Sequence, residues 1–322
     1  MFFSVIVPLY NKSSTINRAI NSVLNQTFTD YELIIVNDGS TDNSLSEINK
    51  YVNFKNINII NQKNQGVSVA RNTGILRAKG ELITFLDPDD EWEPNHLESI
   101  YDVYKSCDKI DAIYFTCFKL ILSNGNTINT LNEVSNKILD GDYYKVCTNL
   151  FDIYYDFKNG LIHTNSVMIP KKVFDKVGLF VKGLKRMEDI DMWCRVMIYY
   201  PAVCIGETTT KYHRDESSET AMITRSFNWP FINTAEKLLT TGKVRKEIEK
   251  SLTFFLDISK ISISRHMIMY GKKMESIKLL SSVRCKKKYA KKLFVTYILF
   301  IFPSHIIKKI YIYLHNDYLN GQ

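Results

Sequence analysis

The sequence lacks the features that mark several common classes of protein. Its six cysteines are widely spaced and include no Cys-x-x-Cys pair, which argues against a zinc site or a disulfide framework and suits a reducing compartment. Met1 leads almost directly into an apolar, strand-like run, so we expect no signal peptide and a protein that faces the cytosol. No internal repeat is found, and the composition, 45% hydrophobic and 24% charged, is that of a globular chain.

Acidic residues are scarce only near the C-terminus. From 242 to 322 the chain has 17 Lys or Arg and 5 Asp or Glu, a net charge of +12, whereas the whole chain carries +8. Residues 1–241 therefore have a net charge of −4. Because the excess of positive over negative charge is confined to the last quarter, the chain does not resemble a uniformly basic nucleic-acid binder.

Apolar runs alternate with amphipathic stretches over the first ninety residues. The pattern predicts strands at 4–8, 32–36, 57–60 and 82–86 and helices at 14–26, 40–51 and 67–78. Strands and helices that alternate in this way form right-handed crossovers. We therefore expect an α/β fold around a mostly parallel sheet flanked by helices.

The pattern is looser after a predicted helix at 98–106. It predicts a strand at 112–122, a hairpin turn at 123–126, a helix ending at Gly178, and short strands at 167–169, 203–205 and 209–213. A helix at 187–200 would face inward with Ile190, Trp193, Val196 and Met197. From about 220 onward the pattern is helical and basic.

Polar residues follow the predicted strands at 8–11, 37–40, 64–66 and 87–90. Ligands of open parallel sheets bind at the carboxyl ends of the strands, although any one such loop is commonly polar for other reasons. The last loop is more specific, because Asp87, Asp89 and Asp90 place three carboxylates on one tight turn. Like charges this close favour a bound cation, and Mg²⁺ or Mn²⁺ commonly shares its ligands with substrate phosphates. The alternative, a helix cap, needs only one acid.

Several blocks of the sequence resemble the family 2 glycosyltransferases in their residues, order and spacing. They are VIVPLYN at 5–11, SVLNQTF at 22–28, ELIIVNDGSTD at 32–42, GVSVARNTG at 66–74, FLDPDD at 85–90 and MEDIDMWCR at 187–195. The resemblance covers about residues 1–215. It implies a GT-A fold with a Rossmann-like nucleotide-binding sheet, an inverting transfer, and a nucleotide-diphosphate sugar as donor.

By the same resemblance, particular residues receive roles. Those expected to bind the donor are Pro8, Tyr10 and Asp38 around the nucleoside, Arg71 near the base and diphosphate, and Asp89 at the ribose. Asp90 would ligate the metal, with Asp87 supporting that turn. These roles suit the chemistry, since a base N–H needs an acceptor and a diphosphate suits Arg and a divalent ion.

The block at 187–195 carries the expected catalytic acids. By position Asp189 would be the base that takes the proton of the acceptor hydroxyl, with Glu188 helping to position the site. The simpler explanation is that acids favour the first turn of a helix, by ~0.3–1 kcal/mol each. Asp191 lies two positions on and would point ~200° around the helix, so it cannot share a pocket with Asp189. His213, in a Tyr-His-Arg order that departs from the family's usual Tyr-Arg-x-His, is a candidate ligand of the metal or a phosphate, or a structural residue.

The basic tail contains an uncharged stretch at 293–307. Lysines at 286–288 and 291–292 precede it, and lysines at 308–309 follow it. Fifteen residues are short of the ~20 that span a bilayer, and Pro303 interrupts the helix. Apolar and aromatic residues flanked by lysines predict an interfacial helix that lies on a membrane. The alternative is a helical cap with Phe294, Ile298, Ile301 and Phe302 in its core.

The sequence therefore predicts a catalytic domain at 1–215, with a nucleotide-sugar half at 1–110 and an acceptor half at 111–215, and a helical, basic, membrane-associating region at 216–322. The expected function is a metal-dependent hexosyl transfer, with UDP-sugar favoured as donor. The acceptor would be a saccharide, possibly on a polyprenyl diphosphate at the inner face of the plasma membrane, in synthesis of a surface polysaccharide such as capsule or O-antigen. Two alternatives remain. The first is a nucleotidyltransferase, which usually has a glycine-rich phosphate loop near the first strand. The second is a non-catalytic scaffold, which would bind a nucleotide or sugar without turnover.

Overall fold

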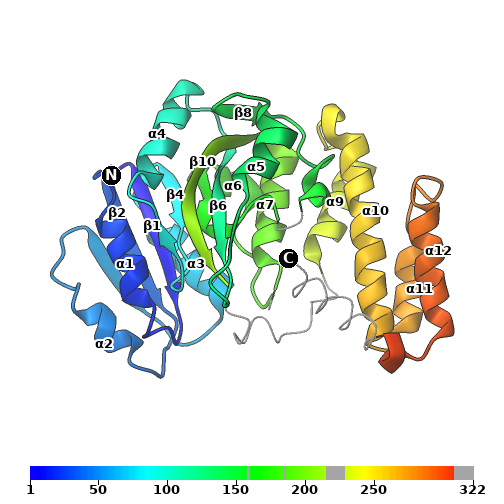
Figure 1. The fold of residues 1–322 in the computed structure, drawn as a ribbon, viewed down its shortest axis with the longest axis horizontal. Helices are drawn as coiled ribbons and strands as arrows, with labels where there is room; N and C mark the ends of the chain where they lie inside the picture. Colours follow the sequence, from blue (N-terminus) through cyan, green and yellow to red (C-terminus); the bar gives the residue numbers. More distant parts are fainter. Residues whose placement is uncertain (158–159, 185, 215–228, 308–322) are drawn as a thin grey trace. The chain divides into compact units, whose positions relative to one another are not determined.

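The computed structural model describes residues 1–157, 160–184, 186–214 and 229–307. The chain divides into two compact units, Met1–Thr224 and Arg225–Gln322 (Figure 1). The domain boundary predicted at 215/216 lies in the segment 215–228, outside the described residues.

The first unit is built on a ten-stranded sheet with the path β3-β2-β1-β4-β9-β6-β10-β5, from which β7 and β8 branch. Its first part consists of β1 (Phe3–Leu9), α1 (Ile16–Leu24), β2 (Tyr31–Asn37), α2 (Ser44–Asn49), β3 (Ile57–Asn61), α3 (Val67–Arg77) and β4 (Leu82–Phe85). All three neighbouring pairs among these four strands are parallel. The sequence prediction is confirmed here, with element ends shifted by a few residues.

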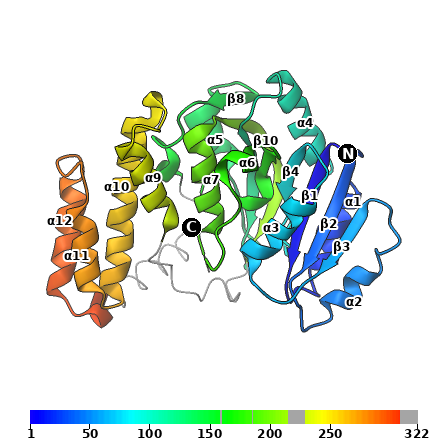
Figure 2. The same ribbon diagram turned by 180° about the vertical axis from the view of Figure 1, so that it is seen from behind.

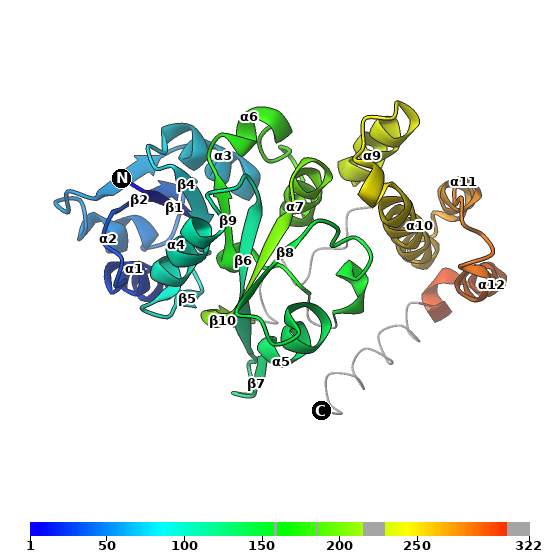
Figure 3. The same cartoon turned by 90° about the horizontal axis from the view of Figure 1, so that it is seen from above.

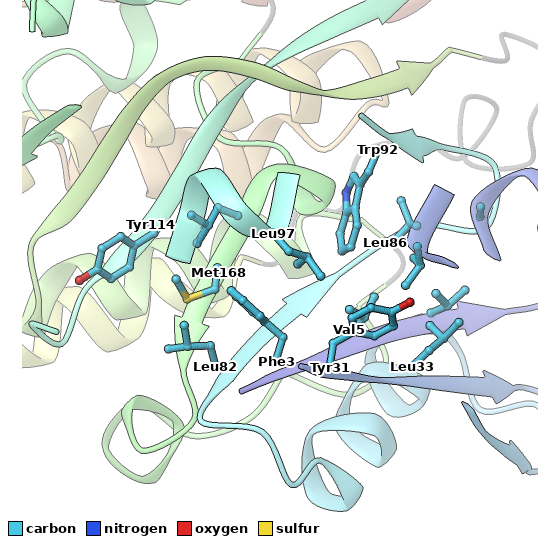
Figure 4. Close-up of a cluster of buried hydrophobic side chains, with 14 of the residues drawn as sticks. Phe3, Val5, Tyr31, Leu33, Leu82, Leu86, Trp92, Leu97, Tyr114 and Met168 are labelled. Atoms are coloured by element: carbon cyan, nitrogen blue, oxygen red, sulfur yellow. The ribbon is translucent and has the colours of Figure 1, made fainter. Parts of the chain in front are cut away.

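The two faces of β1 bury apolar side chains against different helices. Val5, Val7 and Leu9 belong to a core with α1 and α4 (His96–Ser106), part of which is drawn in Figure 4. Figure 2 shows α3 on the opposite face. There Gly74 approaches Ile6 so closely that a Cβ would lie 2.4 Å from its side chain. A strand buried on both faces needs an unbroken apolar run, which explains the sequence of β1.

The second part of the sheet is mixed. It comprises β5 (Glu91–Trp92), β6 (Ile113–Ile121), β7 (Thr127–Asn129), α5 (Leu131–Val134), the π-turn η1 (Ser135–Leu139), β8 (Tyr144–Cys147), the 3₁₀ turns η2 (Tyr154–Asp156) and η3 (Thr164–Ser166), β9 (Val167–Pro170), α6 (Val173–Val177), α7 (Glu188–Tyr199) and β10 (Ala202–His213). Here β9 lies between β4 and β6 and is antiparallel to both, while β6 and β10 are parallel. The mostly parallel arrangement thus holds in the nucleotide half, and antiparallel strands extend it.

Two details of the prediction change. The strands expected at 203–205 and 209–213 are one strand, β10, whose pairing with β6 is irregular between Ile205 and Thr210. On α7, Trp193, Val196 and Met197 are buried as predicted, but Ile190 is only half-buried and lines a cavity. The expected hairpin turn at 123–126 is confirmed by the antiparallel pairing of β6 and β7.

The second unit is helical, as predicted. It consists of α9 (Pro230–Thr240), α10 (Lys246–Met269), α11 (Lys273–Ser281), α12 (Ala290–Ile298) and the short turn η4 (Leu299–Ile301). Figure 3 shows α11 and α12 beside α10, where Ile261, Leu280, Val283 and Leu293 form a small core. Among the described helices, none has both the length and the apolar composition needed to cross a membrane.

The side chains expected in the core of a helical cap are largely outside it. Phe294 is 66% exposed, Ile301 78% and Phe302 44%. The helix α12 ends before Pro303, as the sequence predicts. An exposed apolar face therefore lies next to the lysines at 286–288 and 291–292.

Candidate active site

The structure brings the residues singled out from the sequence together around two cavities. The larger, of about 470 Å³ and called here the active-site cavity, is lined by Pro8, Tyr10, Arg71, Asp87, Asp89, Asp90, Glu188, Asp189 and His213. The smaller, of about 200 Å³, is lined by Asp38 and shares Pro8 and Tyr10 with the larger. Residues from the ends of β1, β4 and β10 and the start of α7 thus meet at one edge of the sheet.

The acidic turn after β4 is fixed by Asn165, which the sequence analysis missed. The Asp87 amide donates to Asn165 Oδ1 (2.8 Å), and Asn165 Nδ2 donates to Asp90 Oδ2. Asn165 is fully buried, and its carbonyl accepts from Trp92 Nε1 (2.8 Å). One buried amide therefore holds both ends of the turn.

Asp90 lies in an unfavourable place for a negative charge. Its carboxylate is 1% exposed. Burial raises the pKa of Asp90 well above its ordinary value, and the neighbouring Asp89 and Asp87 raise it further, against the hydrogen bonds from His213 and Asn165. A cation bound at this turn would offset that cost.

A divalent ion at the acidic turn would find few protein ligands. Within the described part of the chain, no group of three or more His, Cys, Asp and Glu side chains is arranged to hold a metal. The ring of His213 is 2.9 Å from Glu91 Oε1, and its backbone amide, not the ring, bonds Asp90 Oδ1 (2.7 Å). An ion at Asp87 and Asp90 would therefore take further ligands from water and substrate phosphates, as Mg²⁺ commonly does.

Asp89, expected at the ribose, is held by two cations that the sequence analysis did not select. Lys12 Nζ is 2.6 Å from Asp89 Oδ2, and Arg18 donates to the Asp89 carbonyl. Lys12 also lines the active-site cavity.

Arg71 joins the acidic turn to the start of α7. Its buried guanidinium donates to Asp87 Oδ1 (2.8 Å) and to Glu188 Oε1 (3.0 Å). Burial alone would lower the pKa of Arg71, but Asp87, Glu188 and Asp189 together raise it above its ordinary value. The role of Arg71 near the base and diphosphate stays a prediction. In the structure, two of its nitrogens bind carboxylates from the two halves of the site.

The two acids at the start of α7 have different surroundings. Glu188 pairs with Arg71, and burial, followed by the charge of Asp189, raises its pKa. Asp189 accepts from Thr164 Oγ1 (3.3 Å) and from the Ile190 amide (2.7 Å), and it makes no ion pair with any described residue. Met187, just before them, has a left-handed φ of 68°, a strained conformation for a residue with a side chain.

Asp191 is separated from the cavity as the helical geometry predicts. It is fully buried and its Oδ2 accepts from Arg195 Nε (2.8 Å). Arg195 also donates to the Val177 and Leu179 carbonyls. This pair packs α7 against the segment after α6.

His163 and Thr164 complete the cavity wall beside Asn165. His163 Nδ1 accepts from the Asn165 amide (3.4 Å), which leaves the ring proton on Nε2. The His163 ring packs against Tyr212 in a tilted arrangement, with the ring centroids 4.1 Å apart. Burial lowers the pKa of His163 to about 4, so the ring is neutral at pH 7. A polar run directly before the strand at 167 was the one available sequence signal for this segment.

Asp38 is held in the smaller cavity by the loop after β3. It accepts from Gln62 Nε2 (2.7 Å) and from the amides of Gln65 (3.0 Å) and Gly66 (2.8 Å). Gly39 follows with φ of 73°, and a Cβ there would lie 2.8 Å from the Asn64 nitrogen. The tight approach of these two loops shapes the pocket.

The fold places the chain among GT-A proteins. It superposes on residues 1–349 of S. aureus TarS, solved in complex with UDP-GlcNAc, with a TM-score of 0.62 and 17% identity over 90% of this chain and 92% of that one. The sequence model of glycosyl transferase family 2 matches residues 4–169, and the chain belongs to this family.

Relatives found by sequence similarity are consistent with membership of this family. A glycosyltransferase of Rickettsia conorii is 32% identical over 67% of this chain and 35% of its own length. The minor teichoic acid biosynthesis protein GgaA of Bacillus subtilis is 26% identical over 70% of this chain and 50% of its own. The chain thus spans about a third of the length of the rickettsial relative and half of GgaA.

Proposed function

We propose that this chain transfers a sugar, with inversion, from a nucleotide-diphosphate sugar to a saccharide acceptor. The single observation that supports this most is the active-site cavity, in which Arg71 joins the acidic turn to Glu188 and Asp189. The groups that the family resemblance assigns to the diphosphate and to the acceptor line this one cavity.

In this proposal Asp189 takes the proton of the acceptor hydroxyl. The acceptor oxygen then forms its bond to the anomeric carbon while the bond from that carbon to the diphosphate breaks. Thr164 orients the Asp189 carboxylate, and Arg71 keeps Glu188 beside it. Asp38, Tyr10 and Pro8 would hold the nucleoside, and Asp89 the ribose.

Asp90, supported by Asp87, would hold Mn²⁺ or Mg²⁺ against the diphosphate. When bound, the ion offsets the negative charge that grows on the leaving group. His213 would support the Asp90 turn through its backbone amide, while its ring contacts Glu91.

The substrate class is proposed from the relatives together with the site. TarS was solved with UDP-GlcNAc, and GgaA is named for teichoic acid biosynthesis. We propose a UDP-sugar as donor, and as acceptor a growing surface polysaccharide carried on a polyprenyl diphosphate. A non-catalytic scaffold would bind the same donor without turnover.

A screen of UDP-, GDP- and dTDP-sugars by thermal unfolding, with and without Mn²⁺, tests the donor assignment. At a hundred times Kd the UDP-sugar should stabilise the protein by ~2.7 kcal/mol, because only the folded state binds it. The stabilisation should require Mn²⁺. Equal shifts for all three nucleotides, or none, would contradict the choice of UDP.

We further propose that α12 and the segment 299–302 after it rest on the inner face of the plasma membrane. Phe294, Val295, Tyr297, Ile301 and Phe302 are exposed, and lysines stand on either side of them. Aromatic and aliphatic groups beside lysines bind anionic bilayers in this way.

Replacing Phe294 and Ile301 together by Asp should lower binding to phosphatidylglycerol vesicles at least about tenfold, since each buried apolar side chain contributes ~1.5–3 kcal/mol. Co-sedimentation measures the bound fraction. Leu76→Asp is the matched control, because Leu76 is 70% exposed on α3. Loss of binding in the control as well, or in neither, would show that α12 is not the contact.

A further inference from the structure

A third cavity, of about 360 Å³, lies beside the active-site cavity and shares Lys12, Asp89 and His213 with it. We call it the basic cavity. Besides the shared residues, its wall includes Arg18 from α1 and Arg214, which directly follows β10. Neither the donor nor the acceptor assignments above make use of Arg18 or Arg214.

The charges of this cavity do not balance. Lys12 is paired with Asp89, and the His213 ring faces Glu91. Arg18 donates to the Asp89 carbonyl, an uncharged acceptor, and its Nε is buried without a hydrogen-bond partner among the described residues. Arg214 is exposed, and its guanidinium makes no ion pair with any described residue. Among the described residues, therefore, no carboxylate pairs with either of the two guanidinium groups that line the cavity.

The remaining wall suits an anion as well. Ser14 and Thr15 line the cavity just before α1, whose first turn contains no acidic residue. The N-terminal end of a helix carries a partial positive charge, which adds to the field of the arginines.

Arg71 is less suited to bind a phosphate here, because it already pairs with Asp87 and Glu188. Arg186 also lines the active-site cavity, whereas Arg18 and Arg214 are the arginines that line the basic cavity. Guanidinium groups bind phosphate oxygens through paired, charge-assisted hydrogen bonds.

We propose that Arg18 and Arg214 form a site for a phosphate group of a substrate, next to the Lys12–Asp89 pair. This deepens the proposed function and rests on it for the nature of the substrates. Two sources share the chemistry: the diphosphate of the donor, and a phosphate carried by the acceptor.

The test compares wild-type protein with Arg18→Gln, Arg214→Gln and the control Arg77→Gln, which changes an exposed arginine at the end of α3. Binding is measured by calorimetry with Mn²⁺ for UDP, uridine, inorganic pyrophosphate and a synthetic glycerol phosphate oligomer. Arg214→Gln should weaken a phosphate probe about tenfold, the size of one charge-assisted hydrogen bond. Uridine binding should not change, and the control should behave as wild type.

The pattern of losses identifies the source. Weaker UDP and pyrophosphate binding assigns the site to the donor diphosphate, and weaker binding of the oligomer alone assigns it to the acceptor. Folded arginine variants that bind every phosphate probe as wild type does would overturn the proposal, as would a wild type that binds none. Arg214-dependent binding of pyrophosphate without any binding of UDP would instead contradict the donor assignment, and leave the phosphate site standing.

Discussion

Asp189→Asn should lower kcat by about 10³-fold, within the 10²–10⁴-fold range of general-base catalysis. The change removes the proton acceptor but keeps the size of the side chain. The Thr164 hydroxyl can still donate to the amide oxygen. The affinity for the donor should be unchanged, because the proposed donor contacts are made by Tyr10, Asp38 and Asp89 and not by Asp189.

Steady-state kinetics together with calorimetric titration of the donor measure both quantities. The matched control is Asp102→Asn, the same change at an exposed position of α4. If Glu188→Gln abolished transfer while Asp189→Asn kept most of it, the two acids would have exchanged roles. Loss of donor binding in Asp189→Asn would place this carboxylate on the donor instead.

Asp90→Ala should abolish transfer, by at least about 10³-fold, because stabilisation of the leaving group by a metal is worth several kcal/mol. Removal of the metal with EDTA should have the same effect on wild-type protein, and added Mn²⁺ or Mg²⁺ should reverse it. The variant should also lose the Mn²⁺-dependent part of donor binding.

The fold of Asp90→Ala can be followed separately by its thermal unfolding. The substitution removes a buried carboxylate with a raised pKa, but it also leaves the His213 amide and Asn165 Nδ2 without an acceptor. Asp102→Ala serves as the control. Transfer by the Asp90 variant in EDTA at the wild-type rate would remove the metal from the mechanism.

The nucleotide half of the fold could be predicted because its signals are local. Each of β1 to β4 is a short apolar run, and each is followed by turn residues or a helix of regular spacing. The acceptor half gave weaker signals. A run of three apolar residues at 167–169 predicts a strand but not its neighbours. It does not predict that β9 lies between β4 and β6 and is antiparallel to both.

The same distinction holds for the site. The predicted residues sit in recognisable blocks, and all of them line the two cavities. The residues that hold them were missed, because their partners are far away in the sequence: Asn165 reaches across 75 positions to Asp90, and Lys12 across 77 to Asp89. No periodicity or spacing reports such pairs, and only the folded chain brings them together.

The charged tail could be predicted only in part. The sequence located the basic tail by its charge count, but it did not separate a packed cap from an exposed face. The exposure of Phe294 and Ile301 favours the second.

The most direct test of the central claim is the release of nucleoside diphosphate from a UDP-sugar by wild-type protein, Asp90→Ala and Asp189→Asn in one assay with Mn²⁺ and a saccharide acceptor. We expect turnover by the wild type alone, loss of that turnover in EDTA, and donor binding without turnover in Asp189→Asn. Equal release by all three proteins, or binding without turnover by the wild type, would contradict a glycosyltransferase site at this cavity.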